Sequence, residues 1–146
     1  MATIGVISDI QKVDQYKQDI INLLEQREFD KLDCRADAAR THKDVFPNGI
    51  WKLHYIYSGL VEIKGHATEH DWTDRLAPLQ QWIATKPPSI IAHVALAGAY
   101  ITFAWDARGN GSSDTVTGNG WRLFNQRLEK AKSILDENSE LNRKML

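Results

Sequence analysis

The sequence holds little of what several protein classes require. Cys34 is the only cysteine among 146 residues, so no disulfide can form within the chain and a disulfide-stapled fold is excluded. Neither sign of charge is in excess, because the 18 Lys and Arg residues and the 19 Asp and Glu residues give a net charge of −1 at pH 7. Without a basic excess, the chain is not expected to bind nucleic acid through sequence-independent phosphate contacts.

Long apolar runs are also scarce. No basic residue precedes an apolar stretch near the N-terminus, as a secretory signal would require, so we expect a cytoplasmic protein. The longest apolar segment, residues 90–105, is shorter than the roughly 20 residues that a membrane-spanning helix needs. We interpret this segment as a buried helix of a soluble bundle and expect no membrane partner.

The apolar residues that are present follow helical spacing. They make up 42% of the chain and charged residues 25%, as in ordinary globular domains, and they recur every three or four residues. Residues 4–10 are the one weak candidate for a strand. The pattern predicts a single all-α domain over residues 1–146, with about six helices in antiparallel pairs, a loosely ordered segment at 1–11 and a glycine-rich loop at 108–120. The expected helices are residues 13–26, 29–43, 50–63, 72–85, 90–107 and 121–138.

Local signals sharpen two of these helices. Ser89 is expected to cap the helix that begins at residue 90, and Thr117 or Asn119 the helix that begins at 121. The last helix has the most regular stripe of side chains predicted to face inward. Its members are Trp121, Phe124, Leu128, Ala131 and Leu135.

Residues 72–138 are similar to tetratricopeptide helix hairpins. Ala92, Ala95 and Ala99 provide the small side chains that let two helices nest closely, although the loop at 108–120 is too long for the strict repeat. Three motifs are more specific: Trp72-x-x-Arg75-Leu76-x-x-Leu79-x-x-Trp82, Ala104-Trp105-x-Ala107-Arg108-Gly109-x-Gly111 and Gly120-Trp121-x-x-Phe124. Through them the chain resembles a bacterial domain-of-unknown-function family (four-zero-three-four) with tetratricopeptide-like helices. The resemblance implies a right-handed α-solenoid or a helical bundle, and it implies no particular activity.

Motifs that could carry chemistry are weak. His66 and His70 are four residues apart, but they follow Gly65 and lack a metalloprotease His-Glu-x-x-His pattern, so we interpret them as part of a solvated loop. The two Gly-Asn-Gly segments lack the strand and the lysine of a phosphate-binding loop. Cys34 is expected to be a structural or surface thiol. The sequence therefore predicts no catalytic residue, no metal and no cofactor.

The tryptophans are the feature that most favours a function, because Trp and Tyr are enriched at interaction hot spots. We predict a non-catalytic helical-repeat module that binds a protein or peptide partner and is itself a monomer or weak homodimer. The residues expected to contact the partner are Trp51, Tyr55, Trp105, Arg108 and Trp121. Two alternatives are open: an immunity or inhibitor protein that binds a bacterial toxin, and an enzyme. The enzyme would need a site built from two or more of His54, Arg75, His93, Asp106 and Arg108.

Overall fold

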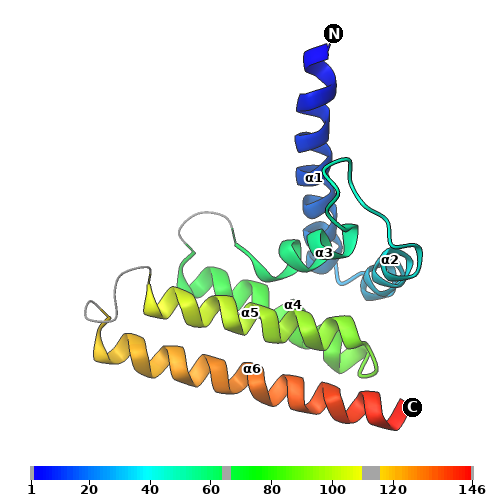
Figure 1. Ribbon diagram of the computed structural model, residues 1–146. Coiled ribbons are helices and arrows are strands. Elements are labelled where there is room, and N and C mark those ends of the chain that lie inside the picture. The colour runs from blue at the N-terminus through cyan, green and yellow to red at the C-terminus, as the bar shows by residue number, and fades with distance from the viewer. Residues whose placement is uncertain (1, 64–66, 110–115, 146) are drawn as a thin grey trace. The chain divides into compact units, whose positions relative to one another are not determined.

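A computed structural model describes the backbone of residues 2–63, 67–109 and 116–145, and the side chains within 10–63, 67–109 and 116–139. Six α-helices occur in this part of the chain (Figure 1). They are α1 (Ala2–Glu25), α2 (Phe29–His42), α3 (Lys52–Val61), α4 (Glu69–Thr85), α5 (Ile90–Arg108) and α6 (Gly118–Met145). The described residues contain no β-strand, and an isolated antiparallel bridge joins Val45 and Trp51. The all-α prediction is confirmed, whereas the solenoid arrangement stays a prediction.

The helix bounds differ from the predicted ones mainly near the two ends of the chain. α1 begins at Ala2, so it includes residues 2–12, which the apolar pattern left outside, and the strand candidate at 4–10 is helical. α6 begins at Gly118 and continues to Met145, beyond the predicted bounds of 121 and 138. Good helix propensity explains the extension at residues 139–145, where Glu, Leu, Arg, Lys and Met prevail, but it does not explain residues 2–12, which include Gly5 and several β-branched residues.

The chain divides into two compact units, residues 1–60 and 61–146, where the sequence pattern was interpreted as one domain. In the N-terminal unit, α1 packs against α2. All four apolar residues of the α2 stripe, Phe29, Leu32, Ala36 and Ala39, are buried. Gly59 allows α3 to approach α1 closely, because a Cβ at this position would lie 3.3 Å from the carbonyl oxygen of Lys17.

In the C-terminal unit, α5 packs against both α4 and α6, and α6 runs antiparallel to α5 (Figure 1). Ala92, Ala95 and Ala99 are all 0% exposed, so the small residues of α5 do lie in the helix contacts, as predicted. Gly98 faces Val61 so closely that a Cβ there would lie 2.8 Å from the Val61 Cγ1 atom. The small side chains of α5 therefore set how closely its neighbours approach.

α5 is also the one helix among the described residues with the length and composition of a membrane-crossing segment. Half of its apolar window is buried within the structure. Core helices of soluble proteins can have the same length and apolar composition. The cytoplasmic location stays a prediction.

The caps explain where several helices begin. The Ser89 hydroxyl accepts a hydrogen bond from the Ala92 N–H at 3.2 Å, which confirms the predicted cap of α5. A capping box that the sequence analysis missed starts α4: the Thr68 hydroxyl accepts from the Asp71 N–H, and the Asp71 carboxylate accepts from the Thr68 N–H. α4 consequently begins at Glu69, three residues before the predicted start at 72, so His70 lies on a helix and not in the expected solvated loop.

One prediction about α6 was wrong. Leu135 is 39% exposed, whereas Ile134 and Asn138 are buried together with Ala131. At about 100° per residue, Leu135 lies about 40° to one side of Ala131, whereas Ile134 lies about 60° to the other side, with Asn138 between them. The buried face of α6 is turned toward Ile134 and away from Leu135. The buried stripe therefore continues through Ile134 to Asn138, the last buried side chain that the structure describes.

Candidate functional site

The junction of α5 and α6 brings together three of the five residues predicted to contact a partner. The Arg108 guanidinium lies over two indole rings, with its Cζ atom 5.3 Å from the Trp105 centroid and 5.5 Å from the Trp121 centroid. Phe124 completes the group with edge-on contacts at centroid distances of 5.1 Å to Trp105 and 5.7 Å to Trp121. We call these four residues, Trp105, Arg108, Trp121 and Phe124, the Trp–Arg cluster.

Backbone features at both helix ends position the Trp–Arg cluster. α5 ends at Arg108 because Gly109 has φ +80°, in the left-handed region that a residue with a side chain disfavours. The Thr117 hydroxyl accepts from the Gly120 N–H at 2.9 Å and so caps α6, one of the two caps predicted for this helix. Gly120 is buried against α5, since a Cβ there would lie 2.8 Å from the Ala107 carbonyl oxygen. These short contacts bring Trp121 next to the last turn of α5.

The Trp–Arg cluster combines apolar area with one fixed positive charge. Trp105 is 52% exposed, whereas Arg108, Trp121 and Phe124 are half-buried. The Arg108 Nη1 atom also donates to the Gly109 carbonyl oxygen at 3.1 Å. The charge of the guanidinium is attracted to the faces of both indoles. The chemistry of this surface is recognition through an exposed aromatic ring beside a cation.

Trp51 and Tyr55, the other two residues predicted to contact a partner, lie in the N-terminal unit. Trp51 precedes α3 and is 48% exposed. Tyr55 is half-buried on α3, and its hydroxyl accepts a hydrogen bond from the Asn48 side-chain amide at 2.9 Å. These two residues are therefore assigned to the N-terminal unit and not to the Trp–Arg cluster.

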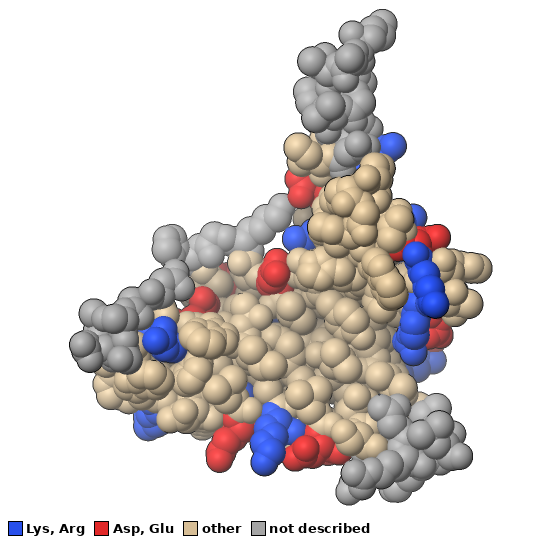
Figure 2. Space-filling view, in the orientation of Figure 1, with Lys and Arg blue, Asp and Glu red and all other residues tan. Residues whose placement is uncertain are grey.

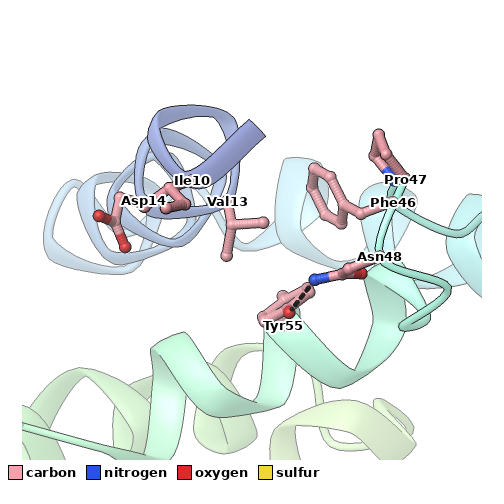
Figure 3. A pocket seen from close by; sticks show the side chains of 7 residues that line it. All are labelled: Ile10, Val13, Asp14, Phe46, Pro47, Asn48 and Tyr55. Carbon is pink, nitrogen blue, oxygen red and sulfur yellow. Dashed lines mark hydrogen bonds between the residues drawn. The ribbon is translucent and has the colours of Figure 1, made fainter. Parts of the chain in front are cut away.

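Tyr55 lines a cavity of about 350 Å³ in the N-terminal unit. Figure 3 labels its lining residues, which come from α1, from the connection between α2 and α3, and from α3 itself. Asn48 and Gly49 form a turn in the connection between α2, which ends at His42, and α3. In this turn the Asn48 Oδ1 atom accepts from the Ile50 N–H at 2.9 Å, and Gly49 has φ +83°.

A second polar cluster, which the sequence analysis missed, connects α4, α5 and α6. The Arg127 side chain is 11% exposed, and its Cζ atom lies 3.3 Å from the ring centroid of Phe103. Its two terminal nitrogens donate to the Phe103 carbonyl oxygen at 3.0 Å and to the Glu69 carboxylate at 3.1 Å. Burial lowers the pKa of the Arg127 guanidinium, and the Glu69 carboxylate acts in the opposite direction.

The neighbouring contacts extend this cluster. Phe103 stacks on Trp72 at a centroid distance of 5.2 Å, and the Trp72 Nε1–H donates to Asp106 at 2.6 Å. One signal in the sequence could have revealed Arg127, because it is a charged residue on the inward stripe of α6 between Phe124 and Ala131. A charge on a buried stripe needs a partner in the structure.

The residues considered for an enzyme contact different neighbours. His93 is buried with its Nδ1 atom 2.7 Å from the Ser89 carbonyl oxygen, and Arg75 donates to the Glu62 carbonyl oxygen at 2.8 Å. His54 is exposed in the N-terminal unit with its ring edge-on to Tyr55. Asp106 and Arg108 make the contacts with Trp72 and with the Trp–Arg cluster given above.

The remaining candidate residues are His66, His70 and Cys34. His66 lies outside the described residues, and His70 is exposed in the first turn of α4 with its Nε2 atom 3.3 Å from the Asp74 carboxylate. Cys34 is exposed on α2. Within the described part of the chain, no three His, Cys, Asp or Glu side chains converge as metal ligands.

Comparison with known proteins adds no assignment: no family model matches the chain, and no curated protein or solved structure gives a significant match. The family resemblance carried by the motifs therefore stays a prediction, and the function must be argued from the geometry above.

Proposed function

We propose that this chain is a non-catalytic interaction module that binds a protein or peptide partner through the Trp–Arg cluster. The observation that carries the proposal is the exposure of Trp105, whose indole is 52% accessible although Arg108 and Phe124 hold it in place. Trp and Arg are the side chains that most often dominate binding energy at interfaces. An exposed indole that is already held in position loses little conformational freedom on binding.

The surface next to the Trp–Arg cluster supports this proposal. Ile101 lies one turn before Trp105 on α5 and is 37% exposed. Figure 2 shows an uncharged surface over the middle of α5, while Lys, Arg, Asp and Glu side chains gather along the outer edge over α6. Charged residues are depleted at the centre of protein interfaces, and this uncharged surface bordered by charges has the same distribution. The partner is expected to place an apolar side chain against Trp105 and Ile101.

The proposal includes the finer predictions made from the sequence. These are a tetratricopeptide-like arrangement of the helices, a cytoplasmic location, and a monomeric or weakly dimeric state. A bacterial toxin is one class of partner that such a module would bind, and the identity of the partner decides between a general interaction module and an immunity protein.

The test is to capture the partner, to identify it, and then to measure its affinity with purified proteins. Immobilised wild-type chain is incubated with extract of the source cells, and the bound protein is identified by mass spectrometry and produced separately. Isothermal titration calorimetry then compares the wild type with Trp105→Ala and with Leu135→Ala. Leu135 is the matched control, because it is an exposed apolar residue at 39% on α6, away from the Trp–Arg cluster.

We expect Trp105→Ala to raise the Kd about 30-fold or more, as the loss of a hot-spot side chain does. Leu135→Ala should leave the Kd unchanged. Arg108→Ala should also weaken binding while the far-UV circular dichroism of the chain is preserved. If Arg108→Ala only lowers the melting temperature, Arg108 is structural; if Trp105→Ala binds like the wild type, the Trp–Arg cluster is not the interface.

A further inference from the structure

We propose that the cavity of the N-terminal unit is a binding site for a small organic ammonium ion, that is, a compact apolar amine that is protonated at neutral pH. The cavity has a volume of about 350 Å³. This lies within the range of roughly 300–1,000 Å³ that is typical of small-molecule pockets. The proposal does not depend on the proposed function, because the Trp–Arg cluster belongs to the C-terminal unit.

The wall of the cavity is apolar and aromatic. Phe46 is 8% exposed, and the rings of Tyr16 and Tyr55 pack edge-on against it at centroid distances of 5.4 and 5.3 Å. Across the cavity, the Val13 side chain points from α1 toward Phe46 and Tyr55, and Ile10 lies one turn before it (Figure 3). An aromatic wall that is held by its neighbours offers a fixed surface for the apolar body of a ligand and an electron-rich face for a cation.

The charge of the cavity selects a cation. Among the described residues that line it, Asp14 is the only acidic or basic one. Its carboxylate is exposed on α1, and Figure 3 shows it on the far side of Ile10 and Val13 from Phe46 and Tyr55. A ligand with an apolar body and an ammonium group satisfies both features, whereas a carboxylate ligand would meet like charge at the same position.

Tyr55 offers a further acceptor for the ammonium group. The Asn48 amide donates to the Tyr55 hydroxyl oxygen at 2.9 Å, while the Asn48 Oδ1 atom is engaged with the Ile50 N–H. A phenolic oxygen has two lone pairs, so it can accept a second hydrogen bond from an ammonium N–H. Figure 3 shows the Tyr55 hydroxyl directed at the Asn48 amide, and both residues line the cavity.

Lys52 provides the strongest argument for the opposite charge. Its Nζ atom lies 5.6 Å from the ring centroid of Phe46. This contact shows that the Phe46 ring accepts a cation, but the lysine also brings a positive charge near the cavity, which would favour an anionic ligand. The experiment therefore compares two ligands that share one apolar body and differ in charge.

The probes are phenethylammonium and hydrocinnamate, titrated into the full-length ¹⁵N-labelled chain and followed by chemical shift changes. A probe of this size is expected to bind with a Kd on the order of 1 mM. We expect phenethylammonium to shift the amide signals of Val13, Phe46 and Tyr55 in a saturable way. Hydrocinnamate should bind at least tenfold more weakly.

Three variants make the inference falsifiable. Asp14→Asn should raise the Kd of phenethylammonium about fivefold, the effect of one exposed charge pair in water, while Glu25→Gln, at an exposed carboxylate elsewhere on α1, should leave it unchanged. Val13→Phe should fill the cavity and abolish binding. Equal affinity for the two probes, an unchanged Kd in Asp14→Asn, or the absence of saturable shifts at these positions would each overturn the proposal. Because Asp14 is exposed, Asp14→Asn gives a clear answer even if Val13→Phe disturbs the fold.

Discussion

Arg127 offers the most direct test of what holds the C-terminal unit together. Its guanidinium touches α5 through the ring and the carbonyl oxygen of Phe103, and it touches α4 through Glu69. Replacing Arg127 by alanine removes these contacts in one step and keeps the helix propensity of α6. The expected result is a large loss of stability from a single residue on α6.

The size of the effect follows from the burial of each contact. A cation over an aromatic ring contributes about 2 kcal/mol when it is largely desolvated, and a hydrogen bond from a charged donor contributes about 1.5–3 kcal/mol. The ion pair adds about 0–1 kcal/mol, because the Glu69 side chain is 77% exposed. Removing the buried guanidinium also recovers part of its desolvation cost. We therefore expect Arg127→Ala to lower the free energy of unfolding by about 2–3 kcal/mol.

Urea denaturation followed by tryptophan fluorescence is a suitable assay, because four of the five tryptophans lie in the C-terminal unit. Glu69→Gln should lower the free energy of unfolding by less than about 1 kcal/mol. Arg127→Lys should recover only part of the loss, because an ammonium group cannot stack and donate in two directions as a guanidinium does.

Arg122 is the matched control on the same helix. It is exposed, and it donates to the side chain of Asn119. Arg122→Ala should change the free energy of unfolding by less than about 0.5 kcal/mol. The argument would be refuted if Arg127→Ala and Arg122→Ala had the same small effect.

Three further predictions concern packing and caps. Gly120→Ala should lower the free energy of unfolding by about 1–3 kcal/mol in urea denaturation, because its Cβ would lie 2.8 Å from a backbone carbonyl oxygen of α5; Gly118→Ala, with nothing within 4 Å, should be neutral or stabilising. Asn138→Leu should raise the melting temperature, because the Asn138 Oδ1 atom is buried with no hydrogen-bond partner among the described residues, and an unchanged or lower value would contradict this. Two hydrogen bonds with Thr68 lower the pKa of Asp71. The cap therefore stabilises α4 fully at pH values above the ordinary carboxyl pKa, and this stabilisation is lost as the pH falls through the lowered pKa. A ¹³C titration should show a higher Asp71 pKa in Thr68→Ala.

The sequence predicted the helices because most of them bury one regular stripe. The stripe of α2 and the alanines of α5 are buried as expected, since helical spacing alone decides which of their side chains share a face. The caps at Ser89 and Thr117 were also predictable, because each depends on one hydroxyl within three residues of its donor. Such local rules need no knowledge of the partner helix.

The features that the sequence analysis missed depend on distant residues. Gly59 looks like a poor helix former in the sequence, and its role appears only when the backbone of Lys17 lies beside it. The position of Arg127 between Phe124 and Ala131 suggests burial, but its partners Phe103 and Glu69 are known only from the structure. The cavity beside Phe46 joins segments of α1 and α3 that no local pattern links. Helical periodicity does not specify which helices pack together, so it could not predict these contacts.

Arg108 at the end of α5 and Arg127 on α6 show how burial separates an effect on stability from an effect on binding. Both place a guanidinium over aromatic rings, Arg127 over Phe103 at 3.3 Å and Arg108 over two indoles at 5.3 and 5.5 Å. The Arg127 side chain is 11% exposed and tied to two other helices, so its removal should mainly change the free energy of unfolding. Arg108 lies beside Trp105, whose ring is 52% exposed, so its removal should mainly change the affinity for a partner. Measuring stability and affinity for both alanine variants tests this division, and it fails if both residues change the same quantity.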